Sequence, residues 1–127
     1  MEEGEMKIEK FEDIQSWRKA RELSNLVYDV TMRDSFTRDY VLSKQIRAAS
    51  GSVMHNIAEG FDAGYDKEFI RFLKLTRRSA TEVQSEIYLA IDRRYISQIV
   101  FTAIYEKAID VKKLINAFIG YLSSSKS

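Results

Sequence analysis

Residues 45–61 read QIRAASGSVMHNIAEGF, and this stretch decides the fold. At about 100° per residue, its apolar side chains return every three or four positions, which is the period of an amphipathic α-helix with one face in a core. A polar stripe on the same helix consists of Gln45, Ser52, Asn56 and Glu59. Gly60 reads as the glycine that ends the helix. The stretch therefore predicts a helix that ends near residue 59.

The middle of this helix carries almost no side-chain volume. Residues 48–52 read AASGS, and a glycine inside a helix costs about 0.5 to 1 kcal/mol relative to alanine. Such small residues indicate that another segment comes close. Two interpretations are open, namely packing against a neighbouring helix of the same chain and contact with another subunit.

Three further helices are predicted on either side of this one. We expect them over residues 13–32, over residues 66–93 and from Ser97 onward, because apolar residues recur there at helical spacing. Ser35 or Thr37 is expected to cap the second helix, Asp66 the third and Ser97 the fourth. Short connections make sequential helices antiparallel. The predicted fold class is therefore all-α, an up-down-up-down antiparallel four-helix bundle.

The charges divide the chain into three parts. Residues 1–13 hold six acidic and two basic side chains, whereas the remainder holds 18 basic and 13 acidic ones. We interpret residues 1–12 as an acidic, partly disordered leader, residues 13–122 as the bundle and residues 123–127 as a frayed tail. The bundle alone is basic, although the whole chain has a formal net charge of +1.

Several kinds of site are excluded by composition. The chain has no Cys and one His, so it offers neither a thiolate metal site nor the two Glu-x-x-His motifs of a di-iron bundle. We expect no cofactor and no metal. No apolar run is long enough to span a membrane and no signal peptide is evident, so the expectation is a cytoplasmic protein without a membrane partner.

The candidate catalytic pair is incomplete. Small helical HEPN ribonucleases carry an Arg and a His at shorter spacing, whereas here seven residues separate Arg47 from His55 and rotate them about 80° apart. No nucleophile-base set and no glycine-rich phosphate loop can be assembled either. We expect a protein that is not an enzyme, with a ribonuclease as a remote alternative.

A family resemblance rests on motifs in the second and third helices. Gln45-Ile46-Arg47, Ala49, Ser52 and Asn56-Ile57-Ala58-Glu59-Gly60 are followed by Glu68-Phe69, Phe72-Leu73, Ser79 and Glu82. This pattern resembles the bacterial four helix bundle protein family, the large-subunit rRNA intervening-sequence proteins. Their relatives include the accessory protein of diversity-generating retroelements, which binds nucleic acid and a reverse transcriptase. The resemblance implies an up-and-down bundle, a homopentamer and a capacity to bind RNA or DNA.

Two surfaces follow from residues that the core does not use. A basic stripe suited to phosphates consists of Lys44, Arg47, Arg71, Lys74, Arg77 and Arg78. The alternative for these residues is a solvated face paired with carboxylates. Surplus apolar residues on the third and fourth helices predict an oligomer interface, and they are Leu75, Leu89, Phe101, Tyr105 and Ile109.

The functional hypothesis is a non-enzymatic, homo-oligomeric scaffold or accessory protein that binds nucleic acid non-specifically through basic stripes. The alternative is a ring that binds only protein partners and no nucleic acid. Residue spacing does not separate the two hypotheses, whereas the salt dependence of nucleic-acid binding does.

Overall fold

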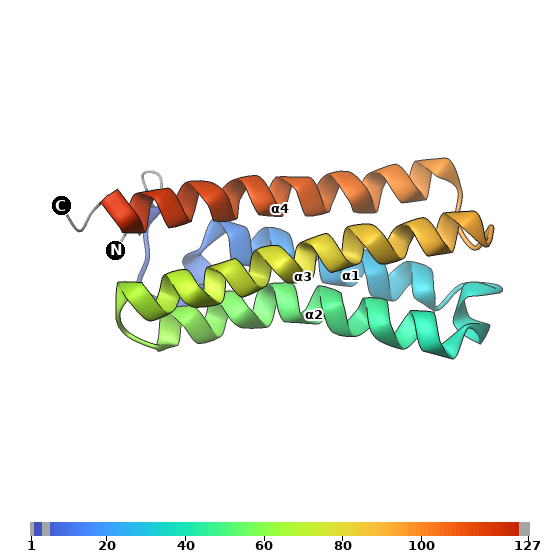
Figure 1. Cartoon of the computed structure of the whole chain (residues 1–127), viewed down its shortest axis with the longest axis horizontal. Helices are drawn as coiled ribbons and strands as arrows, with labels where there is room; N and C mark the ends of the chain where they lie inside the picture. The colour runs from blue at the N-terminus through green and yellow to red at the C-terminus, as the bar shows by residue number, and fades with distance from the viewer. Residues whose placement is uncertain (1, 4–5, 125–127) are drawn as a thin grey trace.

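The computed structural model describes residues 2–3 and 6–124 of the chain. Within this part, four long helices lie side by side (Figure 1): α1 (Gln15–Thr31), α2 (Tyr40–Asp62), α3 (Asp66–Asp92) and α4 (Gln98–Ser124). Each helix packs against the next, and α4 also packs against α1. The chain reverses direction at each connection (Figure 1), so the predicted up-down-up-down bundle is confirmed. Residues 1, 4–5 and 125–127, which belong to the predicted leader and tail, lie outside the described residues.

Part of the acidic leader packs on the bundle. β1 (Glu2–Glu3) and β2 (Met6–Lys7) pair antiparallel, and a short 3-10 helix spans Phe11–Asp13. Ile8 is only 4% exposed and belongs to the core. The Phe11 ring meets the Trp17 ring edge-on, with the ring centroids 5.0 Å apart. These apolar contacts place the segment against the start of α1.

The core has the composition that helical periodicity predicts. The buried positions along the helices recur at steps of three or four residues, and they are Ile14, Trp17, Ala20, Leu23, Val27, Val30, Leu42, Ile46, Ala49, Val53, Ile57, Phe69, Leu73, Thr76, Ala80, Val83, Ile87, Ala90, Ile104, Ala108, Val111, Ile115, Phe118 and Leu122. The one polar member, Thr76, donates its hydroxyl to the Val53 carbonyl at 3.1 Å. A buried polar group with a partner avoids a desolvation penalty of about 1–3 kcal/mol. The seam of α3 is therefore continuous despite the threonine.

The caps agree only in part with expectation. Asp66, predicted as the cap of the third helix, is instead the first residue of α3, and the N-cap residue is Tyr65. Ser97 accepts the Val100 N–H at 3.2 Å at the start of α4, as predicted. The cap of α2 is Asp39 rather than Ser35 or Thr37, because the Asp39 carboxylate accepts the Leu42 N–H at 3.1 Å. That carboxylate also accepts the Tyr95 hydroxyl at 2.9 Å and an Arg93 N–H at 3.0 Å. One side chain thus links the start of α2 to the α3–α4 turn.

Gly60 does not end α2, so this prediction was wrong. The helix continues through it to Asp62, and Gly60 is buried against α3. A Cβ added at Gly60 would lie 2.7 Å from the Phe72 Cβ and 2.9 Å from the Phe69 Cδ1. The glycine is needed for close helix approach. The left-handed turn after α2 is made instead by Gly64, whose φ is +87°.

Candidate functional site

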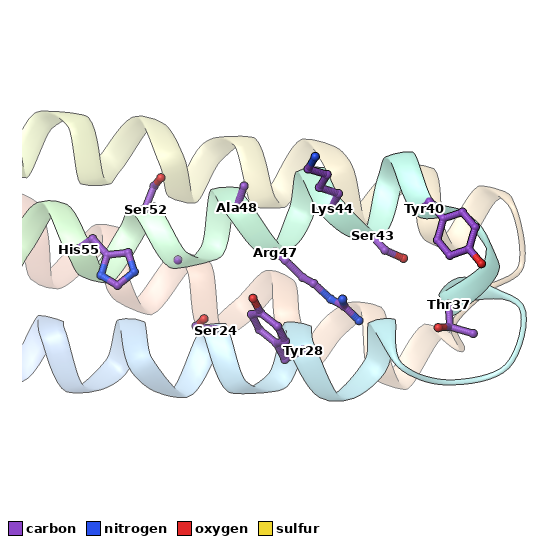
Figure 2. Close-up of a pocket in the computed structure, with 11 residues that line it drawn as sticks. Ser24, Tyr28, Thr37, Tyr40, Ser43, Lys44, Arg47, Ala48, Ser52 and His55 are labelled. Atoms are coloured by element: carbon purple, nitrogen blue, oxygen red, sulfur yellow. The ribbon is translucent and has the colours of Figure 1, made fainter.

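A hollow of about 700 Å³ lies between α1 and α2. Figure 2 shows it from outside the bundle, with His55 at one end and Thr37 and Tyr40 at the other. It is lined by Ser24, Tyr28, Thr37, Tyr40, Ser43, Lys44, Arg47, Ala48, Gly51, Ser52 and His55. Most of these side chains are small or polar, and the lack of volume at Ser24, Ala48, Gly51 and Ser52 keeps the space open. Within the described part of the chain, no carboxylate lines this hollow.

Arg47 is held at the centre of the hollow by two contacts with α1. Its Nε donates to the Thr31 hydroxyl oxygen at 2.8 Å, and its guanidinium carbon lies 5.0 Å from the centroid of the Tyr28 ring. Thr31 is fully buried, and its own hydroxyl donates to the Tyr28 carbonyl at 3.1 Å. The arginine therefore crosses from α2 to α1 in a defined orientation (Figure 2).

The run of small residues at 48–52 is explained only in part by packing within the chain. Ala49 and Ser50 are buried within the chain, where they allow the helices of one bundle to pack. Gly51 instead faces the hollow, and a Cβ built there would meet only the His55 ring at 3.8 Å. Packing within the described residues does not require a glycine at this position.

The hollow also separates the candidate catalytic pair. Arg47 and His55 both line it, but eight residues of helix place their Cα atoms about 12 Å apart along the axis. A proton donor and a phosphate-binding group must both lie within hydrogen-bond reach of one reacting centre, so this spacing disfavours a ribonuclease. No cluster of three or more His, Asp or Glu that could hold a metal occurs among residues 2–3 and 6–124.

A family model described as 23S rRNA-intervening sequence protein matches residues 12–117. The chain belongs to this family.

A crystal structure of a protein of unknown function from the S23 ribosomal protein family of Bacteroides thetaiotaomicron VPI-5482 is similar to this intervening-sequence family member, with a TM-score of 0.75. The two chains are 24% identical, and the match covers 82% of this chain and 97% of the other. At this identity the likeness shows a shared fold alone. No curated protein matches the chain.

In this member of the intervening-sequence family, the six predicted cations do not form one surface. Lys44 and Arg47 lie in the α1–α2 hollow, whereas Arg77 and Arg78 line a second hollow of about 360 Å³ together with Thr81 and Lys112. This second hollow lies between α3 and α4, the two helices that do not line the first hollow.

The remaining cations of α3 differ in their partners. Arg71 pairs with Glu68 and lies over the Phe72 ring, with its guanidinium carbon 4.6 Å from the centroid. Arg77 donates to the Asn116 side-chain oxygen at 2.7 Å. Lys74 and Arg78 are exposed, and neither pairs with a carboxylate within the part of the chain that the structure describes.

The polar stripe of α2 is not gathered into one site either. Asn56 donates its side-chain amide to the Ser52 carbonyl at 2.9 Å, a bond within the helix. Gln45 and Glu59 are exposed, and Gly60 is buried against α3. Of the four side chains that make up this stripe, only that of Ser52 lines the α1–α2 hollow.

The predicted oligomer interface is partly covered by its own chain. Leu89 is exposed. The other four members are half-buried, namely Leu75, Phe101, Tyr105 and Ile109. Phe101 and Tyr105 form an aromatic cluster with Tyr88, whose ring centroid lies 4.9 Å and 5.8 Å from theirs. Tyr88 is itself 50% exposed, so this cluster still presents an aromatic surface.

Sequence reasoning missed Glu86 on α3. Its side chain is only 8% exposed, and its Oε1 makes no hydrogen bond to any of the described residues. Burial, and then the nearby Glu82 carboxylate, raise the pKa of Glu86 to about 7. The signal available in the sequence was a second Glu one turn after Glu82, directly before the core residue Ile87.

No helix in the described part of the chain is both long and apolar enough to cross a membrane.

Proposed function

We propose that the protein is a non-enzymatic, self-associating cytoplasmic scaffold that binds nucleic acid non-specifically through its phosphates. The observation that carries this proposal is the α3–α4 hollow. Three cations from two helices, Arg77, Arg78 and Lys112, converge there with the hydroxyl of Thr81, and none of the lining residues in the described chain is acidic.

The chemistry of this hollow suits a phosphate backbone. Arg77 and Lys112 are held by the neutral acceptors Asn116 and Gln84, at 2.7 Å and 3.0 Å, and therefore keep their positive charge available. Arg78 is exposed and free to bind, and Lys74 stands one turn before it on the same helix. Such cations neutralise phosphates and release counterions without reading the base sequence.

Self-association is supported by apolar surface at one end of the bundle. α1 ends, α2 begins and the α3–α4 turn lies at this end (Figure 1). Large exposed hydrophobic side chains collect there, namely Met32, Tyr40, Val41, Tyr88, Leu89 and Ile99. Monomers rarely leave contiguous apolar patches in water. A closed ring of copies covers such a surface without forming fibres, and the family resemblance implies five copies.

Binding of a labelled RNA and a labelled DNA duplex, followed by fluorescence anisotropy, tests the nucleic-acid proposal. Affinity should fall steeply as salt rises from about 50 to 200 mM. Arg78→Gln should reduce the slope of log affinity against log salt by about 1. Arg71→Gln is the matched control, because Arg71 is already paired with Glu68, and it should leave the slope unchanged. Absence of binding at low salt would reject the proposal.

Light scattering on the same samples tests the assembly. We expect a mass near five times the chain's 14.8 kDa. A monomer at micromolar concentration would remove the scaffold from the proposal.

A ring that binds only proteins is the second candidate. The aromatic cluster of Tyr88, Phe101 and Tyr105 favours it, because half-exposed aromatic residues are enriched at protein interfaces. An intact oligomer that fails to bind either nucleic acid at low salt supports this candidate over the first.

A further inference from the structure

The guanidinium of Arg47 is held in place, but not all of its hydrogen-bond donors have a protein partner among the described residues. Thr31 and Tyr28 hold its Nε and its face. Among residues 7–124, no protein group accepts a hydrogen bond from its two Nη atoms. An arginine presents these atoms as a fork that matches two oxygens of one anion. Fixing the fork in advance lowers the entropy that a ligand must lose on binding.

A second polar group faces the same hollow from α1. Ser24 lines the hollow beneath α2 (Figure 2), and its hydroxyl forms no hydrogen bond within the described chain. A hydroxyl group both donates and accepts hydrogen bonds. It can therefore bind a ligand oxygen that enters the hollow.

The positive charge around these groups favours an anionic ligand. Lys44 lies one turn before Arg47 and lines the same space. Neither cation pairs with a carboxylate of the described residues, although the chain contains 19 Asp and Glu. Two cations and nearby hydroxyl groups match a phosphate dianion better than a single carboxylate. The volume of about 700 Å³ lies within the range of small-molecule sites.

From these observations we propose that the α1–α2 hollow binds an organic phosphate of nucleotide size, with the phosphate held by the Arg47 fork. Tyr40 and His55 stand at opposite ends of the hollow (Figure 2), seven and eight residues from Arg47. Each end offers a ring against which a base or sugar can pack. This site does not depend on the α3–α4 hollow and goes beyond the nucleic-acid proposal.

Isothermal titration calorimetry on the full chain tests the site with AMP, ribose 5-phosphate and adenosine as probes. AMP and ribose 5-phosphate should bind, and AMP should bind at least about 10-fold tighter than adenosine, because a charge-assisted fork is among the strongest polar contacts. Arg47→Gln should weaken AMP binding by about 10-fold or more. Arg78→Gln, which removes the same charge from the other hollow, should leave AMP affinity unchanged.

A second variant keeps the test informative if Arg47→Gln fails to fold. Lys44 is exposed and forms no ion pair with the described residues, so Lys44→Gln should fold and still weaken AMP binding severalfold. Equal binding of AMP and adenosine overturns the proposal. AMP binding that survives Arg47→Gln also overturns the proposal. So does a failure of AMP to bind because a carboxylate of a second copy occupies the hollow. In that case Arg47→Gln should lower the mass of the oligomer.

The phosphate has two sources, a free nucleotide and the end of a nucleic-acid strand. A short oligonucleotide with a 5′ phosphate and the same oligonucleotide without it separate them. If the end of a strand is bound, the 5′ phosphate should tighten binding in the wild type and not in Arg47→Gln. Non-specific backbone binding at α3–α4 responds instead to Arg78→Gln, so each proposal can fail without the other.

Discussion

The two glycines of α2 should respond in opposite directions to the same substitution. Gly51 and Gly60 both lie inside the helix, so replacement by alanine gains about 0.5 to 1 kcal/mol of helix propensity at either position. Their surroundings differ. The added methyl at Gly51 meets only the His55 ring at 3.8 Å, whereas at Gly60 it would lie 2.7 Å from the Phe72 Cβ.

The magnitude follows from that overlap. Carbon atoms in contact rest about 3.5–4.0 Å apart, so the helices α2 and α3 must separate locally because the Phe72 Cβ is attached directly to the backbone. Overpacking of a core in this way costs about 1–3 kcal/mol. Gly51→Ala should therefore stabilise the fold by about 0.5–1 kcal/mol. Gly60→Ala should be less stable than Gly51→Ala by about 1–3 kcal/mol, a difference from which propensity cancels.

Urea unfolding followed by circular dichroism measures both variants against the wild type at one protein concentration, since stability of an oligomer depends on concentration. Equal m-values would show that the change lies in stability rather than in the extent of unfolding. Equal stability of the two variants would refute the account of Gly60 as a close-packing residue. A loss of stability in Gly51→Ala would instead mean that another copy packs into the α1–α2 hollow.

Two further predictions concern carboxyl groups. Because the folded pKa of Glu86 is raised from 4.5 to about 7, the folded state binds a proton that the unfolded chain releases, so stability falls as pH rises through this window. Glu86→Gln should remove that fall and stabilise the protein at pH 8 by about 1–2 kcal/mol. Urea unfolding at pH 5 and pH 8 measures the change. Glu82→Gln removes only the smaller cause of the raised pKa, so it should reduce the fall only in part. The Leu42 N–H, then the Tyr95 hydroxyl, lower the pKa of Asp39, so its contribution is fully present above its ordinary pKa of 3.8 and is lost as pH falls through the lower folded pKa. Asp39→Ala should therefore lower the melting temperature more at pH 7 than at pH 3, and equal losses at both would contradict this role.

Helical periodicity was sufficient to predict the core but not the chain's turns. The inward positions repeat at three and four residues because each helix has one buried face, and this signal lies within each helix. The cap of α2 depends on Asp39, which is chosen over Ser35 by contacts with Arg93 and Tyr95 more than fifty residues away. Gly60 resembled a helix stop for a similar reason, since its real constraint is Phe72 of the next helix.

The same limit explains why the basic residues were predicted and their grouping was not. Arg47 and Lys44 could be paired from spacing on one helix, and Arg77 and Arg78 from spacing on another. Which cations share a hollow depends on the partner helix, and those partners carry no motif. Tyr28 and Thr31 position Arg47 from α1, although their own spacing marks only the edge of an apolar stripe.

The cations of the bundle differ in whether a carboxylate or a neutral group holds them. Where a cation has a carboxylate within one turn, as Arg71 has Glu68, the pair is formed on the surface of one helix and the positive charge is already neutralised. Where the neighbouring groups are neutral, as Thr31 is for Arg47 and Asn116 is for Arg77, the cation is oriented without being neutralised. Orientation by neutral partners preserves both charge and geometry for an anion that comes from outside. Each hollow therefore contains a cation that is oriented by a neutral partner. Such cations are better candidates for binding an anion than the full set of basic residues predicted from the sequence.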